Sequence, residues 1–310
     1  MRAILYTLAL TMFAARASAD VYTLVVSGLG GDPQFEQRFG EQAEAMYKAA
    51  LSASGDAAKV TLLKSERATR EAIAEAIRAV ARRTQAKDQF VLVLIGHGSF
   101  DGEEYRFNVP GPDLTASELG SLLDTVPARQ LIVNATSASG AVIDRWKKPG
   151  RVLITATKSG GERNATRFAQ FWVQALSSAE ADRDKNEIVT AAEAYEYASR
   201  KVADTFKSDV AIATEHAQLA GDAADRFVVS RLGAAAVLSN DSELTVLQTE
   251  QAAAERSLDD LKARKQTLAE PAYYNELESV LLSIARVDQR IAARQSALNS
   301  ASSESNARPR

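Results

Sequence analysis

The sequence predicts an α/β domain with a three-layer, mostly parallel sheet, followed by a C-terminal α-helical hairpin or coiled coil. Over residues 21–233, short apolar runs rich in branched side chains alternate with amphipathic helical segments, as in proteins with a buried parallel sheet. After Gly233 the strands stop and long charged helical segments follow. We therefore expect right-handed β-α-β units with helices on both faces of the sheet, and then a separate pair of helices.

The predicted elements of the domain follow one another in regular order. Strands are expected at residues 21–26, 59–63, 90–95, 131–133 and 152–155, and helices at residues 33–52, 72–83, 115–123 and 190–202. In each helix apolar residues recur every three or four positions, and Thr-x-x-Glu capping boxes open the last two, at Thr115 and Thr190. In sheets of this kind ligands lie beyond the carboxyl ends of the strands, so these ends are where functional residues are expected.

The C-terminal region is predicted to fold separately. A weak linker at residues 233–242 leads to a charged helix at 243–268, which residues 271–274 (Pro-Ala-Tyr-Tyr) interrupt before a second helix at 275–300. The second helix carries a narrow apolar seam, and a polar tail at 301–310 is expected to be disordered. Either the hairpin packs on itself or on the domain, or it is an arm for self-association or partner binding.

The first nineteen residues have the pattern of a secretory signal peptide. Arg2 precedes an apolar segment at residues 4–15, and Ala17-Ser18-Ala19 offers a small-x-small cleavage site. The apolar segment is too short to span a membrane, and no later segment is long and apolar enough to do so. We expect cleavage after Ala19 and a mature protein in the bacterial periplasm or outside the cell.

Composition excludes several classes of function. The chain of 310 residues has a net charge of −3 and no block of Lys and Arg, which argues against nucleic acid as a partner. It has no cysteine, so disulfides, thiolate metal sites and a cysteine nucleophile are excluded together. With two histidines, a histidine-rich metal site is also excluded; His97 alone has a motif around it, while His216 is expected to be structural or on the surface.

Two predicted strand ends carry chemically useful side chains. His97 stands between two glycines directly after strand 90–95, and Ser137 follows strand 131–133. Adjacent parallel strands place both ends at one edge of a sheet, so the imidazole and the hydroxyl are expected to meet. A nucleophile needs a base within hydrogen-bond reach and donors for the oxyanion, and the N–H groups of Gly98 and Ser137 suit the second role. The plainer alternative is that His97 is a core residue ending its strand.

Residues 90–157 resemble the caspase-like clan of peptidases, most closely its legumain-type branch. His97-Gly98 is similar to the histidine element of that family, Ser137-Ala138-Ser139-Gly140 to its Cys-x-Ser-Gly element, and residues 154–159 to the strand and loop beside its specificity pocket. The resemblance implies a caspase-like topology for residues 20–232 and places His97 and Ser137 at the positions of the catalytic pair. It does not extend to the C-terminal hairpin.

Serine in the cysteine's position decides the expected function. A thiol forms a thiolate readily beside histidine, whereas a serine hydroxyl depends on a base that a third group orients, usually a carboxylate. Asp101, Glu103 and Glu104 are near in sequence but lie in no matching motif. We therefore favour a degenerate peptidase that binds a peptide or protein. The alternatives are an active hydrolase with a Ser137–His97 pair, an alignment with Thr136 in the nucleophile position, and a scaffold that works through its hairpin.

Two further motifs resemble ligand-binding sequences. Gly28-Leu29-Gly30-Gly31 follows the first strand, but Pro33 stands where a dinucleotide fingerprint needs its third glycine, so a tight turn is the better interpretation. Residues 182–193 place oxygen ligands at the calcium-binding positions of an EF-hand loop. The predicted ligands are Asp182, Asp184, Asn186 and Glu193. The segment departs from the EF-hand pattern at Glu187, where that loop has glycine. The alternative is an acidic loop before a capping box. No other cofactor is expected.

Overall fold

The computed structural model describes residues 19–54, 56–233, 236 and 241–306. The chain divides near residue 240 into two compact units, the first of which begins at Ala19. The predicted signal peptide lies outside the described residues except for Ala19, and so does most of the predicted linker.

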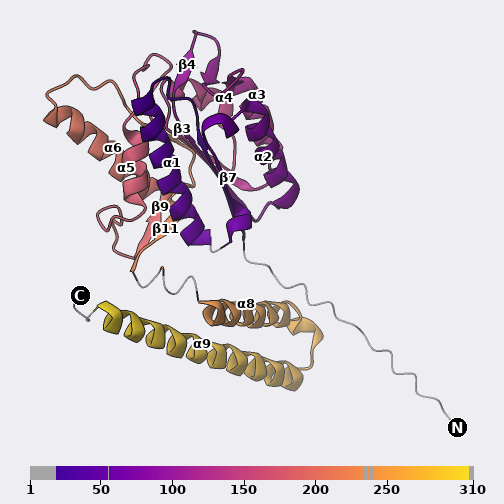
Figure 1. Ribbon diagram of the computed structural model, residues 1–310. Helices are drawn as coiled ribbons and strands as arrows, with labels where there is room; N and C mark the ends of the chain where they lie inside the picture. The colour runs from indigo at the N-terminus through magenta and orange to yellow at the C-terminus, as the bar shows by residue number, and fades with distance from the viewer. Residues whose placement is uncertain (1–18, 55, 234–235, 237–240, 307–310) are drawn as a thin grey trace. The chain divides into compact units, whose positions relative to one another are not determined.

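A six-stranded sheet forms the centre of the first unit (Figure 1). Its strand order is β10-β8-β7-β3-β1-β2, and all neighbours are parallel except β10, which runs antiparallel to β8 at one edge. The strands are β1 (Val21–Ser27), β2 (Val60–Leu63), β3 (Gln89–Ile95), β7 (Arg129–Asn134), β8 (Arg151–Thr155) and β10 (Gln218–Ala220). The predicted α/β class with a mostly parallel sheet is confirmed.

Helices cover both faces of the sheet and make it the middle of three layers. On one face α1 (Pro33–Ser54), α5 (Phe168–Ala175) and α6 (Ala191–Ser208) pack on side chains such as Val93 and Val133. On the other face α2 (Arg70–Arg83), α3 (Ala116–Asp124) and α4 (Ile143–Trp146) pack on side chains such as Leu92 and Ile132. Both predicted capping boxes form, at Thr115 with Glu118 and at Thr190 with Glu193.

Several short elements of the first unit were not predicted from the sequence. A small antiparallel sheet of β4 (Gly98–Phe100), β5 (Tyr105–Phe107) and β6 (Leu114–Thr115) follows His97, and β9 (Ile188–Thr190) pairs with β11 (Val228–Arg231). These strands have two to four residues, too few for an alternating pattern to stand out.

The second unit is an antiparallel pair of helices, α8 (Ser242–Ala263) and α9 (Glu270–Asn306), as the sequence predicts. Two details of the prediction were wrong. Pro271 does not interrupt a helix but lies in the first turn of α9, where its missing N–H has no partner to lose. The helix also continues to Asn306, so residues 301–306 are helical rather than disordered, while 307–310 lie outside the described residues.

The two helices of the second unit pack along each other. Their buried side chains include Leu247 and Leu261 of α8 and Tyr273 and Val287 of α9, of which Val287 belongs to the predicted seam. Ion pairs flank them, including Arg290 with Glu250 at 2.6 Å. Among the helices of the described residues, none combines the length and the apolar character that crossing a membrane requires.

Candidate functional site

His97 and Ser137 meet at the carboxyl edge of the central sheet. His97 follows β3, Ser137 follows β7, and these two strands are hydrogen-bonded neighbours. The imidazole Nδ1 lies 3.4 Å from the Ser137 hydroxyl oxygen across 40 residues of sequence. The structure therefore brings together the two side chains that the sequence placed at one edge.

Aromatic rings and a backbone group hold the imidazole of His97. The rings of Phe35 and Phe39, both on α1, lie edge-on to it with centroids 5.0 Å and 5.1 Å away. Burial lowers the pKa of His97, and a hydrogen bond with the Gly30 backbone opposes that shift. The neutral imidazole that results can accept a proton from a hydroxyl, and a backbone group fixes its orientation.

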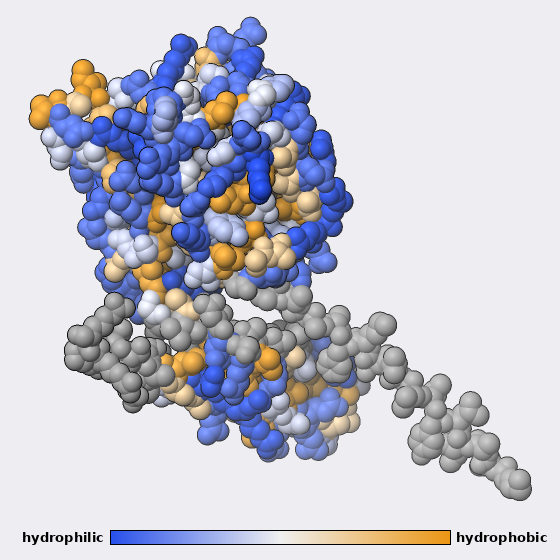
Figure 2. All heavy atoms as spheres, in the orientation of Figure 1, coloured by the Kyte–Doolittle hydropathy of each residue, from blue (hydrophilic) through white to orange (hydrophobic). Residues whose placement is uncertain are grey.

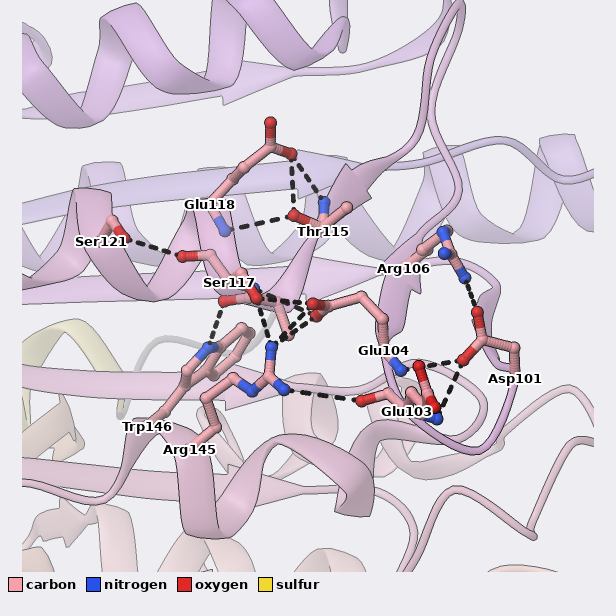
Figure 3. A network of polar contacts seen from close by, with 11 residues as sticks. Asp101, Glu103, Glu104, Arg106, Thr115, Ser117, Glu118, Ser121, Arg145 and Trp146 are labelled. Atoms are coloured by element: carbon pink, nitrogen blue, oxygen red, sulfur yellow. Dashed lines mark hydrogen bonds and ion pairs between the residues drawn. The ribbon is translucent and has the colours of Figure 1, made fainter.

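No carboxylate from the loop after β4 orients His97. Asp101 pairs instead with Arg106 at 2.5 Å and accepts the N–H of Glu103 and Glu104, which holds its pKa far below the usual range. The Glu104 carboxylate bonds to Arg145 and to the hydroxyl of Ser117, away from His97. Figure 3 shows these acidic side chains engaged in a network of their own.

Ser137 is almost completely buried, with 1% of its surface exposed. Its hydroxyl is the one that faces His97, because the hydroxyl of Thr136 is bonded to the Tyr105 hydroxyl at 2.6 Å and to the Asn134 side chain. The alternative alignment with Thr136 at the nucleophile position is therefore not supported. Burial of Tyr105 raises its pKa to about 12, so the phenol stays protonated as a partner for Thr136.

The backbone around the pair is closely packed. A Cβ atom on Gly98 would lie 2.5 Å from the Ser137 carbonyl oxygen, so only glycine fits there. In the part of the chain that the structure describes, the Ser137 N–H donates to no protein acceptor. This group remains free to bind the carbonyl oxygen of a ligand, as the sequence analysis expected of an oxyanion donor.

The loop after β8 is fastened to the turn that follows Ser137. The N–H of Ala138, a residue with a left-handed φ of 55°, donates to the Glu162 carbonyl at 2.7 Å. Ser139 and Gly140 both bond to the Thr157 hydroxyl, at 3.2 Å and 2.9 Å. Residues 154–159, which the resemblance places beside a specificity pocket, thus contact this turn directly.

Sequence reasoning missed the charged side chains beside the pair. Arg38 on α1 stacks over Phe35 and Phe39 and donates to the Thr166 carbonyl, and its buried Nε has no partner among the described residues. Glu215 is buried at the N-terminus of α5, where it accepts the N–H groups of Arg167 and Phe168. Burial raises its pKa to about 7. Neither residue lies in a recognisable motif. Of the groups around His97, only the glycine turn at Gly30 could have been predicted from the sequence, because it follows a strand that lies next to β3.

The acidic loop before α6 gathers three of the predicted calcium ligands. Oxygen atoms of Asp182, Asp184 and Glu193 lie within 4.8 Å of one another. Most of these oxygens also accept hydrogen bonds inside the loop: Asp182 from the N–H of Asn186 and Glu187, and Glu193 from Thr190. Glu187 takes a positive φ of 63°, as the glycine at that EF-hand position does. The oxygen-rich ligand set suits calcium, and the capping box forms as well, so calcium binding stays a prediction.

Comparison with known proteins gives structural likeness alone. No protein-family model matches the sequence, and no curated protein is significantly similar to it. Among solved structures, a protein from Geobacter sulfurreducens is 16% identical with a TM-score of 0.48 over 68% of this chain and 97% of its own. Caspase-1 from Spodoptera frugiperda is 11% identical with a TM-score of 0.45 over 69% of this chain and 88% of its own.

Proposed function

We propose that the first unit is a caspase-like peptidase module that has lost proteolysis and binds a peptide or protein segment in its cleft. The observation that carries the proposal is the pair at the sheet edge: a buried Ser137 hydroxyl lies 3.4 Å from His97, with a backbone group and no carboxylate of the neighbouring loop behind the imidazole. The legumain-type branch, within the caspase-like clan, remains part of this proposal.

Serine is a poor nucleophile in this setting for two reasons. Its hydroxyl is far less acidic than a thiol, so it must lose its proton to a base as the bond forms. Here burial and the charge of Arg38 lower the pKa of His97 by more than the Gly30 backbone and the charge of Asp32 raise it. None of Asp101, Glu103 and Glu104 stabilises the imidazolium that proton transfer would create. A thiol needs less help because its ordinary pKa is about 8.5 and a neighbouring histidine lowers that pKa further, so the thiolate forms readily.

Peptide binding needs only the parts of the site that do not react. The Ser137 N–H, which donates to no protein acceptor among the described residues, can donate to a carbonyl oxygen of a ligand. These features support a binding cleft whether or not a bond is cut there.

A second candidate is a working hydrolase with Ser137 as nucleophile and His97 as base. The free Ser137 N–H favours it, since this group could stabilise a tetrahedral oxyanion. A backbone group can orient a histidine in place of a carboxylate, and the contact of His97 with the Gly30 backbone supplies that orientation.

A fluorophosphonate probe separates the two candidates. The binding-module proposal expects no labelling of the full chain, whereas a hydrolase would be labelled at Ser137 and would lose the label in His97→Ala. Ser99→Ala is the matched control, because Ser99 is exposed on β4 near the site. Labelling that depends on both Ser137 and His97 would overturn the proposal.

Ser137→Cys tests whether the rest of the cleft is still competent. The chain has no other cysteine, so cleavage of a peptide library by this variant would report the site alone. We also propose an extracytoplasmic location, on the N-terminal signal pattern, and self-association through residues 243–300 as the scaffold alternative.

A further inference from the structure

We infer that the segment from Asp209 to Ala217 is a strap that closes over the Ser137 turn through a latch between His216 and Glu162. The strap joins α6 to β10, and the latch holds it to the loop after β8. The inference concerns control of access to the cleft, so its importance to the protein rests on the proposed function.

The latch is built on one carboxylate. Glu162 accepts the backbone N–H of His216 at 3.1 Å and contacts its Nδ1, and it also accepts the Lys158 N–H at 2.9 Å. The carboxylate is largely shielded, with 11% of the side chain exposed, while 43% of the His216 side chain is exposed. Hydrogen bonds to a charged acceptor in a shielded place are among the stronger ones.

The backbone of Glu162 also bonds to the turn that follows Ser137. The Glu162 carbonyl accepts the N–H of Ala138, the residue after Ser137. The loop packs so closely there that a Cβ atom on Gly140 would lie 2.2 Å from the Ser159 nitrogen. Glu162 therefore links the strap to the turn directly, because its side chain bonds to His216 in the strap and its backbone carbonyl bonds to Ala138 in the turn.

The middle of the strap has few contacts. Among the described residues, 212–215 make no main-chain to main-chain hydrogen bond. Val210 and Ile212 are 94% and 89% exposed, and Figure 2 shows an apolar patch at the upper left, where Figure 1 places the chain after α6. An exposed segment with few contacts can open locally at low cost.

The ends of the strap are anchored apart from the latch. Asp209 pairs with Arg167 at 2.7 Å, and the Ala217 carbonyl accepts the Tyr195 hydroxyl at 3.1 Å. The Glu215 carboxylate accepts two N–H groups at the N-terminus of α5. The latch therefore controls the exposed stretch of the strap and not its ends.

The absence of native cysteine makes the latch directly testable. In a Ser137→Cys background the single thiol reports access to the cleft, and its alkylation by iodoacetamide can be followed in the full chain. His216→Ala and Glu162→Gln are each expected to speed alkylation by about tenfold, the factor that corresponds to losing one hydrogen bond to a charged group. Measuring rates from pH 7 to pH 9.5 separates access from a change in the thiol pKa.

Gln218→Ala is the matched control, because Gln218 lies two residues from His216 and its side chain bonds to the adjacent Ala217 carbonyl. It should leave the rate unchanged. Tryptophan fluorescence verifies that each variant is folded, and the exposed His216 carries the test if Glu162→Gln does not fold. Rates within about twofold of the parent in folded His216→Ala would overturn the inference. Alkylation reports access and not peptide binding, so the latch and the proposed function can fail independently.

Discussion

Replacing Glu215 with glutamine should make the first unit more stable at alkaline pH. Burial is the largest influence on this carboxyl group and raises its pKa from 4.5 to about 7, against the two backbone N–H groups of α5 and the charge of Arg167. The folded state therefore holds the proton more tightly than the unfolded chain does. The stability that this gives is present below about pH 4.5 and is lost as pH rises to about 7.

The size of the effect follows from the shift. A difference of about 2.5 pKa units corresponds to about 3 kcal/mol at full ionisation, as an upper limit. Glutamine carries no charge and keeps an oxygen acceptor for one of the two N–H groups of α5, while its NH2 group faces the other; this lost bond lowers stability equally at every pH, so the pH dependence isolates the charge. Between pH 4.5 and pH 8, the free energy of unfolding of the parent should fall relative to that of Glu215→Gln by up to this amount.

Urea denaturation followed by tryptophan fluorescence measures this difference. Both tryptophans of the chain, Trp146 and Trp172, are buried in the first unit, so the signal reports that unit and not the helical hairpin. Glu180→Gln is the control, because Glu180 is exposed and paired with Lys201 on the surface. Parallel pH profiles for the parent and Glu215→Gln, within about 0.5 kcal/mol, would refute the reasoning.

Three other predictions follow from the described contacts. Arg151→Met should destabilise the first unit by about 3 kcal/mol, because the buried Arg151 bonds to Asp124, Gln130 and the Trp146 carbonyl. Lys148→Met is the control, since it removes an exposed partner of Asp124. Equal urea midpoints for the two variants would contradict the expectation. Added calcium should raise the melting temperature of the full chain, and a chelator should reverse this rise. The melting temperature of Asp184→Ala should not change when calcium is added. If the melting temperature of the parent does not respond to calcium either, the prediction of a calcium site is wrong. Leu281→Glu on α9 should lower the mass measured by light scattering if the hairpin self-associates, since this leucine is 47% exposed; a monomeric parent would end the scaffold alternative.

The pair at the sheet edge connects these predictions to function. His97 and the Ser137 N–H lie where a nucleophile would use them, and the hydroxyl that faces the imidazole belongs to Ser137, a residue that is 1% exposed. Introducing sulfur with Ser137→Cys and weakening the latch with His216→Ala separate two causes of the proposed loss of proteolysis, the chemistry of the nucleophile and access to it. The double variant should react with an alkylating agent faster than either change explains alone.

Residue patterns along the chain were enough to predict the architecture of this protein. Apolar runs such as residues 90–95 must be buried, their alternation with helical segments dictates a parallel sheet, and the carboxyl ends of adjacent strands share an edge. That was enough to expect His97 and Ser137 together. It was also enough to predict the two capping boxes and the helical hairpin, because these depend on residues three or four positions apart.

Only the tertiary structure decided what surrounds the pair. The contacts of His97 with Gly30 and Phe39 join residues that are 67 and 58 positions apart, and the contact of Glu162 with His216 spans 54 residues. The pKa of Glu215 depends on burial at a helix end formed by a distant segment. Local patterns carry no information about such contacts, because which loops meet depends on how the whole chain packs.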